Sequence, residues 1–413
     1  MESNINVLKD SFFNIFTVII KLLSPLIVIP ILLENFGISI YGGYVAFLAF
    51  SALICVFTDM GFEMYYSKEV SLHRDNDIVL SSLLSVFLYV KIIVSVTLLL
   101  ISLIVLDTLI FEIKNLFLWL VFITLANSFQ LSSFFSGLGK YKQLSAITTV
   151  SKSFYIALIL SSDYSEYGKE KILFYHGAAL WGSFIAQLVY LHCQKKVKYS
   201  LPSINLLIKT VKAAFGFYFS RLFLNIYNQS STYIVSLFLS SDLVGIYSVA
   251  FQLYKVGQAF IGAIAKVLYT TVVRTKKFIL VKKATIIVTC IYISIIPVVL
   301  FFGESIIEFF LDFESPMIFD VALIFFVSLF FVMLSSFWGY PIMVPLGKDK
   351  LAHYGIFFGS ATYYLFFATM VLFKLESIYT FALCVLISDF SGACFRLYFA
   401  KKTLNKKYFF ANN

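Results

Sequence analysis

The chain has 413 residues, of which 60% are hydrophobic, 19% are aromatic and only 13% are charged. This composition excludes an ordinary soluble globular domain, in which about a quarter of the residues carry charge. The net charge of +10 does not indicate nucleic-acid binding, because the basic residues are spread between apolar segments instead of forming one cluster.

Twelve apolar segments follow one another along the chain, and each is long enough to cross a hydrocarbon core of about 30 Å as a helix. We expect spans at residues 11–33, 41–61, 80–106, 115–136, 143–162, 172–193, 212–239, 244–266, 283–303, 318–346, 352–373 and 377–400. A β-barrel does not fit, because its strands are about ten residues of alternating polarity. The predicted fold class is an all-α polytopic membrane protein with about 12 transmembrane helices.

Positive charge alternates between successive loops. Most basic residues outside the spans lie in every second loop and in the two tails, whereas the other loops carry only Lys114, Lys169, Lys171 and Lys374. The positive-inside rule therefore places both termini in the cytoplasm. An odd number of spans would disturb this alternation, so the charge pattern favours an even count.

Nothing in the sequence indicates an enzyme. No Walker motif (G-x-x-x-x-G-K-[ST]) occurs, and Gly347-Lys348 is followed by Asp349. The four histidines stand apart without the spacing of metal ligands, and the five cysteines form no C-x-x-C motif. We expect no cofactor and no metal, and transport is the function that remains.

Short sequences recur about half a chain length apart. Ser132-Ser133-Phe134 returns as Ser335-Ser336-Phe337, Leu138-Gly139-Lys140 as Leu346-Gly347-Lys348, and Gly42-x-Tyr44 as Gly245-x-Tyr247, at offsets of 203 to 208 residues. A sequence rich in Ser, Phe and Leu also produces such echoes by chance. Taken as a repeat, they predict two six-helix bundles, residues 1–203 and 204–413, that enter the membrane in the same direction and bind substrate between them.

Five basic side chains lie near the middle of apolar spans, namely Lys21, Lys91, Lys152, Arg221 and Lys255. A charge at the centre of a membrane-spanning helix costs about 2.5 to 3.5 kcal/mol, so these residues are expected to face a bundle interior or a water-filled cavity. Acids are scarce beside them, which predicts a cationic lumen for an anionic cargo such as a phosphate or pyrophosphate. For Lys91 the alternative is a side chain that extends past Ser95 toward the interface.

Neutral polar residues share helix faces with these bases. Spacings of three and four residues give the first and the seventh span one polar, cationic face each, and the eighth span carries a similar face. The residues expected to line the lumen are Asn14, Thr17, Asn225, Asn228 and Gln252. Hydrogen bonding between helices is the alternative for each of them taken singly.

Two carboxylates within the spans are candidates for ion coupling. Asp389 lies in the middle of the twelfth span, where the alternatives are protonation during transport and a salt bridge with Arg396, two turns further along the same helix face. Asp59 ends the second span and is followed by Met60 and Gly61. That sequence is typical of a helix end or a hinge, which is the structural alternative for Asp59.

Four segments carry a resemblance to a known family. Pro30 through Phe36-Gly37 to Tyr41-Gly42, Asp59-Met60-Gly61, Gly137 to Lys142 and Val244 to Ala250 together resemble the polysaccharide flippase branch of the multidrug/oligosaccharidyl-lipid/polysaccharide exporter superfamily. The chain is most similar to the O-antigen flippases of Gram-negative bacteria. One departure is Glu63-Met64-Tyr65, where that family often has an Arg.

The resemblance implies a MATE-like fold, with two bundles around a central cavity, and a location in the bacterial cell inner membrane. It also implies alternating access that moves undecaprenyl-diphosphate-linked oligosaccharides from the cytoplasmic to the periplasmic leaflet. H⁺ or Na⁺ coupling and partners such as polysaccharide polymerase and chain-length proteins follow from the same resemblance. The alternatives are a cation-coupled multidrug exporter of the same superfamily and an integral-membrane polysaccharide polymerase or ligase.

Overall fold

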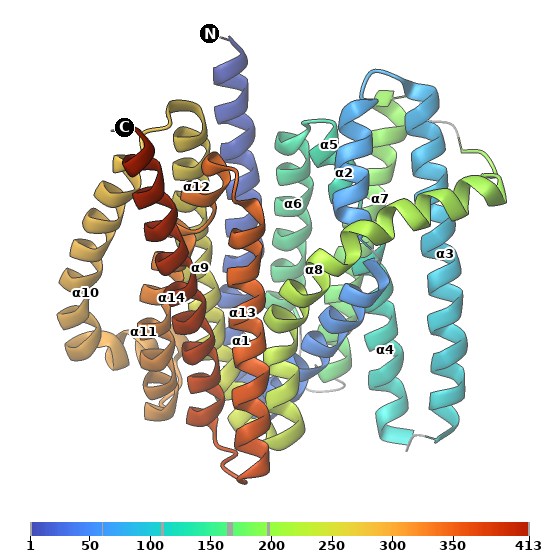
Figure 1. The fold of residues 1–413 in the computed structure, drawn as a ribbon. Coiled ribbons are helices and arrows are strands. Elements are labelled where there is room, and N and C mark those ends of the chain that lie inside the picture. The colour runs from blue at the N-terminus through green and yellow to red at the C-terminus, as the bar shows by residue number, and fades with distance from the viewer. Residues whose placement is uncertain (1, 60, 109–110, 163–167, 196–198, 412–413) are drawn as a thin grey trace. The chain divides into compact units, whose positions relative to one another are not determined.

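The computed structural model describes residues 2–59, 61–108, 111–162, 168–195 and 199–411, and within these helices some side chains, those of residues 219–229 among them, lie outside the description. Figure 1 shows an all-helical chain, without a strand among the described residues. The predicted all-α fold class is therefore confirmed. The helices are α1 (Glu2–Asp59), α2 (Phe62–Leu72), α3 (Asp77–Thr108), α4 (Phe111–Ser128), α5 (Ser132–Gly137), α6 (Tyr141–Leu160), α7 (Gly168–Lys195), α8 (Ile204–Phe238), α9 (Ser241–Thr275), α10 (Ile279–Leu311), α11 (Pro316–Trp338), α12 (Tyr340–Met343), the 3₁₀ helix η1 (Val344–Leu346), α13 (Asp349–Leu372) and α14 (Ile378–Ala411).

Ten helical stretches in the described part of the chain are long and apolar enough to cross a membrane. The first of them, Phe13–Asp59, has 47 residues, and Gly37 interrupts it with φ 74° and ψ 170°. It therefore holds the first two predicted spans, and α8 corresponds to the seventh. Each of the twelve predicted spans has a helical counterpart, and the protein is a multi-pass membrane protein.

Three features of the helices were not predicted. A short extra helix, α2, follows the second span, where the sequence analysis expected a loop. The fourth span divides into α4 and α5, and the tenth divides at Gly339 into α11 and α12. In the tenth span Pro341 marks the division: it lies in the first turn of α12, where its missing N–H needs no partner, and its ring disfavours a continuous helix with the preceding turn.

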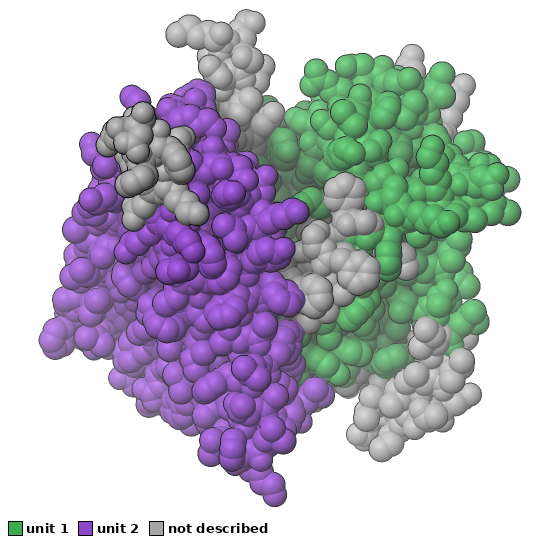
Figure 2. Space-filling view, in the orientation of Figure 1, with its two compact units in different colours: residues 1–31, 44–233 green, residues 32–43, 234–413 purple. Residues whose placement is uncertain are grey.

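The chain divides into two compact units (Figure 2). Unit 1 comprises Met1–Ile31 and Tyr44–Tyr233, and unit 2 comprises Leu32–Gly43 and Ile234–Asn413. These units differ from the predicted bundles 1–203 and 204–413 in two places: α8 falls largely in unit 1, and the segment around Gly37 falls in unit 2. The boundary at residue 203 stays a prediction.

Within each unit the helices pair in the same order. In unit 1, α4 and α6 both pack against α7, and in unit 2, α11 and α13 both pack against α14. The fourth and fifth helices of each six-span set thus contact the sixth. This parallel order is what the sequence repeat predicts for two copies inserted in the same direction.

The Leu-Gly-Lys echo marks the same backbone turn twice. Gly139 has φ 67° and Gly347 has φ 68°, a left-handed conformation that glycine adopts at little cost. The N–H of Lys140 donates to the Phe135 carbonyl at 2.8 Å, and the N–H of Lys348 donates to the Met343 carbonyl at 2.9 Å, 208 residues later. The Ser-Ser-Phe echo has no such match, because Ser132 begins α5 after the division whereas Ser335 precedes the division in α11.

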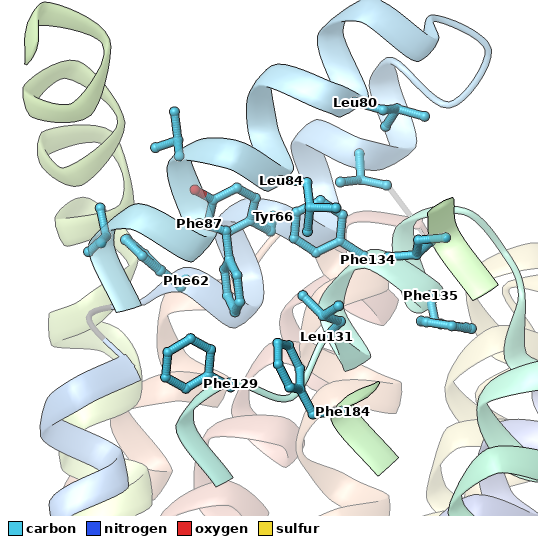
Figure 3. Close-up of a cluster of buried hydrophobic side chains, with 14 of the residues drawn as sticks. Phe62, Tyr66, Leu80, Leu84, Phe87, Phe129, Leu131, Phe134, Phe135 and Phe184 are labelled. Carbon is cyan, nitrogen blue, oxygen red and sulfur yellow. The ribbon is translucent and has the colours of Figure 1, made fainter. Parts of the chain in front are cut away.

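An aromatic core holds α2, α3, α5 and α7 together in unit 1 (Figure 3). The ring centroids of Tyr66 and Phe134 are 5.1 Å apart, and Phe87 meets both rings edge-on. Such aromatic pairs add about 0.5–1.5 kcal/mol each beyond the area they bury. This core fixes the extra helix α2 beside the divided fourth span, at one end of the site described below.

Glycine permits a close backbone contact at the third echo. A Cβ atom on Gly42 would lie 1.8 Å from the Ser241 carbonyl oxygen, and one on Gly245 would lie 2.6 Å from the Ile38 carbonyl oxygen. Both echo glycines therefore lie where two backbones touch, within unit 2, and neither position has room for a larger residue.

Candidate functional site

Two neighbouring pockets in unit 1 gather three of the five predicted cationic residues. The Lys152 pocket has a volume of about 200 Å³ and is lined by Lys21, Asn127, Gln130, Ser132, Leu144, Thr148, Ser151, Lys152, His176, Leu180, Ser183 and Gln187. The Lys91 pocket has a volume of about 430 Å³ and is lined by Lys21, Ala52, Cys55, Val56, Asp59, Glu63, Phe87, Lys91, Asn127, Ser128, Gln130, Ser132 and Ser133. Lys21, Asn127, Gln130 and Ser132 belong to both.

The two pockets differ in the sign of their charges. Among the described residues, the lining of the Lys152 pocket contains two lysines and a histidine but no carboxylate. The Lys91 pocket contains Lys21 and Lys91 together with the carboxylates of Asp59 and Glu63. The first pocket is therefore suited to an anion, whereas the second already holds carboxylate groups as counter-charges.

Helix α6 presents its polar residues to the Lys152 pocket because they recur every three or four positions. Thr148, Ser151, Lys152 and Tyr155 share one helix face. The Ser151 hydroxyl donates to the Ala179 carbonyl of α7 at 2.6 Å, which holds the two helices together. The Lys152 Nζ atom lies 5.8 Å from the Tyr155 ring centroid, in range of a cation–π contact.

Lys91 is held by contacts with α1, α2 and its own helix α3 in unit 1. Its side chain is 2% exposed, and its Nζ atom donates to the Thr58 carbonyl at the end of α1 at 3.0 Å. The Nζ atom also lies 5.5 Å from the Phe62 ring centroid and 5.6 Å from that of Phe87. It does not extend past Ser95 to an interface, and its ammonium group compensates a carbonyl at a helix end, where cations are favoured.

Gln130 and Gln187 hold the division between α4 and α5. The side-chain oxygen of Gln187 accepts the N–H of Leu131 at 2.7 Å, and its amide donates to the Gln130 side-chain oxygen at 2.9 Å. The Gln130 amide in turn donates to the carbonyls of Ala126 and Leu180, both at 2.9 Å. These bonds satisfy backbone groups that a divided helix leaves without partners, and they bring Gln130 to the wall of both pockets.

Asp59 has a local structural role in addition to its place in the Lys91 pocket. Its carboxylate accepts the N–H of Glu63 at 3.3 Å, in the first turn of α2. The next glycine, Gly61, has φ 78°, and a Cβ there would lie 2.4 Å from the Ala214 carbonyl of α8. Asp59 and Gly61 therefore form the sharp connection between α1 and α2, as the helix-end alternative expects.

Lys255, Gln252 and Asp389 lie in unit 2, and none of them lines either of these pockets. The Asp389 carboxylate accepts hydrogen bonds from the hydroxyls of Tyr254 and Ser328, the latter at 2.5 Å. The Gln258 amide donates to the Tyr254 hydroxyl at 2.7 Å, and the Lys255 Nζ atom lies 4.7 Å from the Phe251 ring centroid. Asp389 is thus held by hydroxyl groups of α9 and α11.

Arg396 does not form the salt bridge that its spacing from Asp389 allows. Its guanidinium donates to the Ser335 carbonyl at 3.2 Å, to the Ser335 hydroxyl at 2.8 Å and to the Ala352 carbonyl at 3.1 Å. Among the described residues, no ion pair within 4.0 Å joins it to Asp389. The role of Arg396 is to bind the divided tenth span to α13 and α14.

The remaining candidates fall into two groups. Thr17 is buried and donates to the Phe13 carbonyl of its own helix at 2.8 Å, whereas Asn14 and Gln252 are half-buried. The side chains of Arg221, Asn225 and Asn228, on α8, lie outside the described part of the structure. Their lumen-lining role stays a prediction.

Sequence reasoning missed His176 and Tyr44 at this site, whereas Tyr155 lies on the polar face expected for the fifth span. The Tyr44 hydroxyl lies 2.9 Å from that of Tyr155 and 3.0 Å from Nδ1 of His176. Tyr44 precedes His176 by 132 positions and Tyr155 by 111, so no local spacing links them. The available signal was position alone, since His176 is a titratable residue inside an apolar span.

Comparison with solved structures identifies the fold as that of membrane transporters. A MATE crystal structure in complex with MaL6 matches at a TM-score of 0.63 and 13% identity, covering 97% of this chain and 96% of that one. A MOP superfamily transporter from Pyrococcus furiosus, described as having a binding pocket of reversed polarity that suggests a different function, matches at 0.59 and 14%, covering 96% and 95%. The eukaryotic MATE transporter AtDTX14 matches at 0.58 and 15%, covering 96% and 97%.

The family comes from a sequence comparison. A family model described as polysaccharide biosynthesis protein matches residues 7–276, well over half of the chain. A comparison of the chain with curated proteins found no match. The chain belongs to the polysaccharide biosynthesis protein family and has the MATE fold.

Proposed function

We propose that this protein is a flippase that moves undecaprenyl-diphosphate-linked O-antigen or polysaccharide repeat units from the cytoplasmic to the periplasmic leaflet of the bacterial inner membrane. Its family and its transporter fold support this proposal. The observation that carries it is the Lys152 pocket, in which Lys21 and Lys152 meet without a carboxylate among the described lining residues. Both termini lie in the cytoplasm, as the loop charges indicate.

The pocket chemistry matches the head of such a lipid. Two lysines supply ammonium groups, which pair with phosphate oxygens as point charges. The amide of Asn127 and the hydroxyl of Ser132 supply neutral donors and acceptors of the kind that sugar hydroxyls require. We assign Lys21 and Lys152 to the diphosphate, with Arg221 and Lys255 as further cations of the lumen.

Lys91 has a different part in this proposal. Because its ammonium group is bound to the Thr58 carbonyl and packed between two aromatic rings, it acts on the cargo through its positive field and not by direct contact. Asp389 remains the candidate for H⁺ or Na⁺ coupling, ahead of Asp59, whose carboxylate binds the first turn of α2.

A cation-coupled multidrug exporter is the second candidate, favoured by the fold and by Asp389. Such an exporter needs carboxylates where its cationic drugs bind, yet the carboxylate of Asp389 is held by Tyr254 and Ser328. The Lys152 pocket has the opposite charge. A solved relative with a pocket of reversed polarity is itself described as suggesting a different function, which supports using pocket charge to choose between the candidates.

The test is transport by purified protein in liposomes. A fluorescent undecaprenyl-diphosphate oligosaccharide is reconstituted, and a membrane-impermeant quencher reports the fraction in the outer leaflet over time. We expect wild-type protein to exchange the lipid between leaflets, and Lys21→Ala and Lys152→Ala to slow exchange at least tenfold. The control is Lys142→Ala, which removes an exposed lysine from the first turn of the same helix α6. Exchange that is no faster than in protein-free liposomes would overturn the proposal.

A further inference from the structure

His176 of α7 occupies a place in the Lys152 pocket that the proposed function leaves unused. Its ring lines the pocket together with Lys21 and Lys152. The ring centroid lies 5.0 Å from that of Tyr155, and Nδ1 lies 3.0 Å from the Tyr44 hydroxyl. The imidazole is therefore fixed from two helices while it remains part of the pocket wall.

The hydroxyl groups around His176 suit both of its protonation states. When Nδ1 carries no proton, the Tyr44 hydroxyl donates to it and accepts from the Tyr155 hydroxyl, 2.9 Å away. When Nδ1 carries a proton, it donates to the Tyr44 oxygen, and the Tyr44 proton turns toward Tyr155. Rotation of two hydroxyl groups is sufficient, so no side chain has to move when the imidazole gains or loses a proton.

Among the described residues, the ionisable groups that face His176 are positive or neutral at physiological pH. From α1 they are Lys21 and Tyr44, and from α6 they are Lys152 and Tyr155. Helix α4 contributes the neutral amides Asn127 and Gln130 to the same pocket. Two nearby ammonium groups oppose an imidazolium, whereas an anion placed among all three favours it.

We propose that His176 takes up a proton from the buffered solvent when an anion binds in the Lys152 pocket, so that the loaded pocket has three cations. The proton adds to the ring nitrogen that was unprotonated, and no bond between heavy atoms forms or breaks. This inference rests on the proposed function in one respect: it assumes that the head group of the cargo is anionic. It makes proton concentration a determinant of cargo loading and release, through a residue on α7.

Linkage fixes the sign of the effect. If the anion-bound protein holds one proton more than the free protein, anion affinity rises as pH falls, by about tenfold per pH unit at the steepest. The window lies between the pH at which His176 titrates in the free protein and the higher pH at which it titrates with the anion bound. Outside that window affinity is independent of His176.

The experiment measures binding of inorganic pyrophosphate to the purified full-length protein by calorimetry. Titrations in buffers of different ionisation enthalpy give the number of protons taken up per pyrophosphate between pH 6 and 9. We expect His176→Gln to take up about one proton fewer than wild type at the pH of maximal uptake. The control is His192→Gln, which changes an exposed histidine further along the same helix and is expected to match wild type. Equal uptake by His176→Gln and wild type would overturn the inference, as would absence of pyrophosphate binding.

A second measurement does not depend on any variant folding. In wild-type protein with ¹⁵N-labelled histidine, the ring nitrogens of His176 are expected to shift to imidazolium values when pyrophosphate is added at constant pH. Neutral ring nitrogens in the pyrophosphate-bound protein contradict the inference. Failure of the proposed function would look different. A protein that takes up a proton on binding pyrophosphate but does not exchange the lipid-linked oligosaccharide would contradict the proposed function and leave the His176 inference intact.

Discussion

The fourth and the tenth spans divide at related places, but the two divisions are held by opposite chemistry. In unit 1 the neutral side chain of Gln187 on α7 accepts the N–H of Leu131. In unit 2 the charged side chain of Arg396 on α14, 209 positions later in the sequence, donates to the Ser335 carbonyl. A divided helix leaves N–H donors at its new start and carbonyl acceptors at its old end. In unit 1 the neutral amides of Gln187 and Gln130 serve one of each, the Leu131 N–H and the Ala126 carbonyl, whereas in unit 2 a charged donor binds the Ser335 carbonyl.

This difference explains why the Lys152 pocket lies beside the first division. Gln187 and Gln130 satisfy their partners without net charge and leave room for the lining that they share with Lys21. Arg396 instead fills its surroundings: a Cβ atom on Gly339 would lie 3.1 Å from its Cδ atom, and one on Gly355 would lie 2.6 Å from its Cγ atom. The divided span thus contributes to a pocket wall in unit 1, whereas in unit 2 the Arg396 side chain fills the corresponding space.

The largest effect is expected from Arg396→Ala. It removes three hydrogen bonds and the buried stem that fills the space between Gly339 and Gly355. The free energy of unfolding should fall by about 3 kcal/mol, in the range of large-to-small core substitutions. Denaturant titration in detergent measures it, with Lys402→Ala on the exposed surface of α14 as the control. If the free energy of unfolding falls no further than in Lys402→Ala, Arg396 does not stabilise the packing of the divided tenth span.

A smaller effect is expected from Gln187→Leu, because a neutral acceptor is lost instead of a charged donor. The N–H of Leu131, a fully buried residue, would lose its partner, which costs about 1–3 kcal/mol. Gln187→Glu keeps that acceptor and serves as the matched variant. Hydrogen exchange of the Leu131 amide, measured by mass spectrometry, should accelerate in Gln187→Leu and stay slow in Gln187→Glu. Equal exchange rates of the Leu131 amide in the two variants would mean that Gln187 does not hold the division between α4 and α5.

The sequence predicted the spans well because length and apolar composition decide whether a helix crosses a membrane. It did not predict the division after Ser128, since the following residues, Phe129-Gln130-Leu131, contain neither proline nor glycine. That division depends on Gln187, 56 positions away from Leu131, and only the folded chain brings the two together. At Gly339 a signal was present in the sequence, because Pro341 follows two residues later.

The site was predictable to the extent that it depends on the cost of burying charge. Lys21 and Lys152 were found because an ammonium group inside an apolar span must have a polar environment, and they do line one pocket. The buried ammonium group of Lys91 also has a polar partner, the Thr58 carbonyl, to which it donates a hydrogen bond. His176 escaped notice because its partner Tyr44 comes from α1, and a sequence does not reveal such distant contacts.

The smallest effect tests where the two halves are alike. Gly139 and Gly347 have φ values of 67° and 68° at the same place in matching turns, and a Cβ on Gly347 would meet no atom within 4 Å. Alanine at Gly347 therefore costs only the left-handed backbone conformation, about 1–2 kcal/mol. If the turns are equivalent, Gly139→Ala should cost the same in denaturant titrations, and asparagine should be tolerated better than alanine at both positions. A marked inequality between the two alanine variants would mean that the repeat preserves the sequence of this turn but not its energetics, and that the halves differ beyond their divided spans.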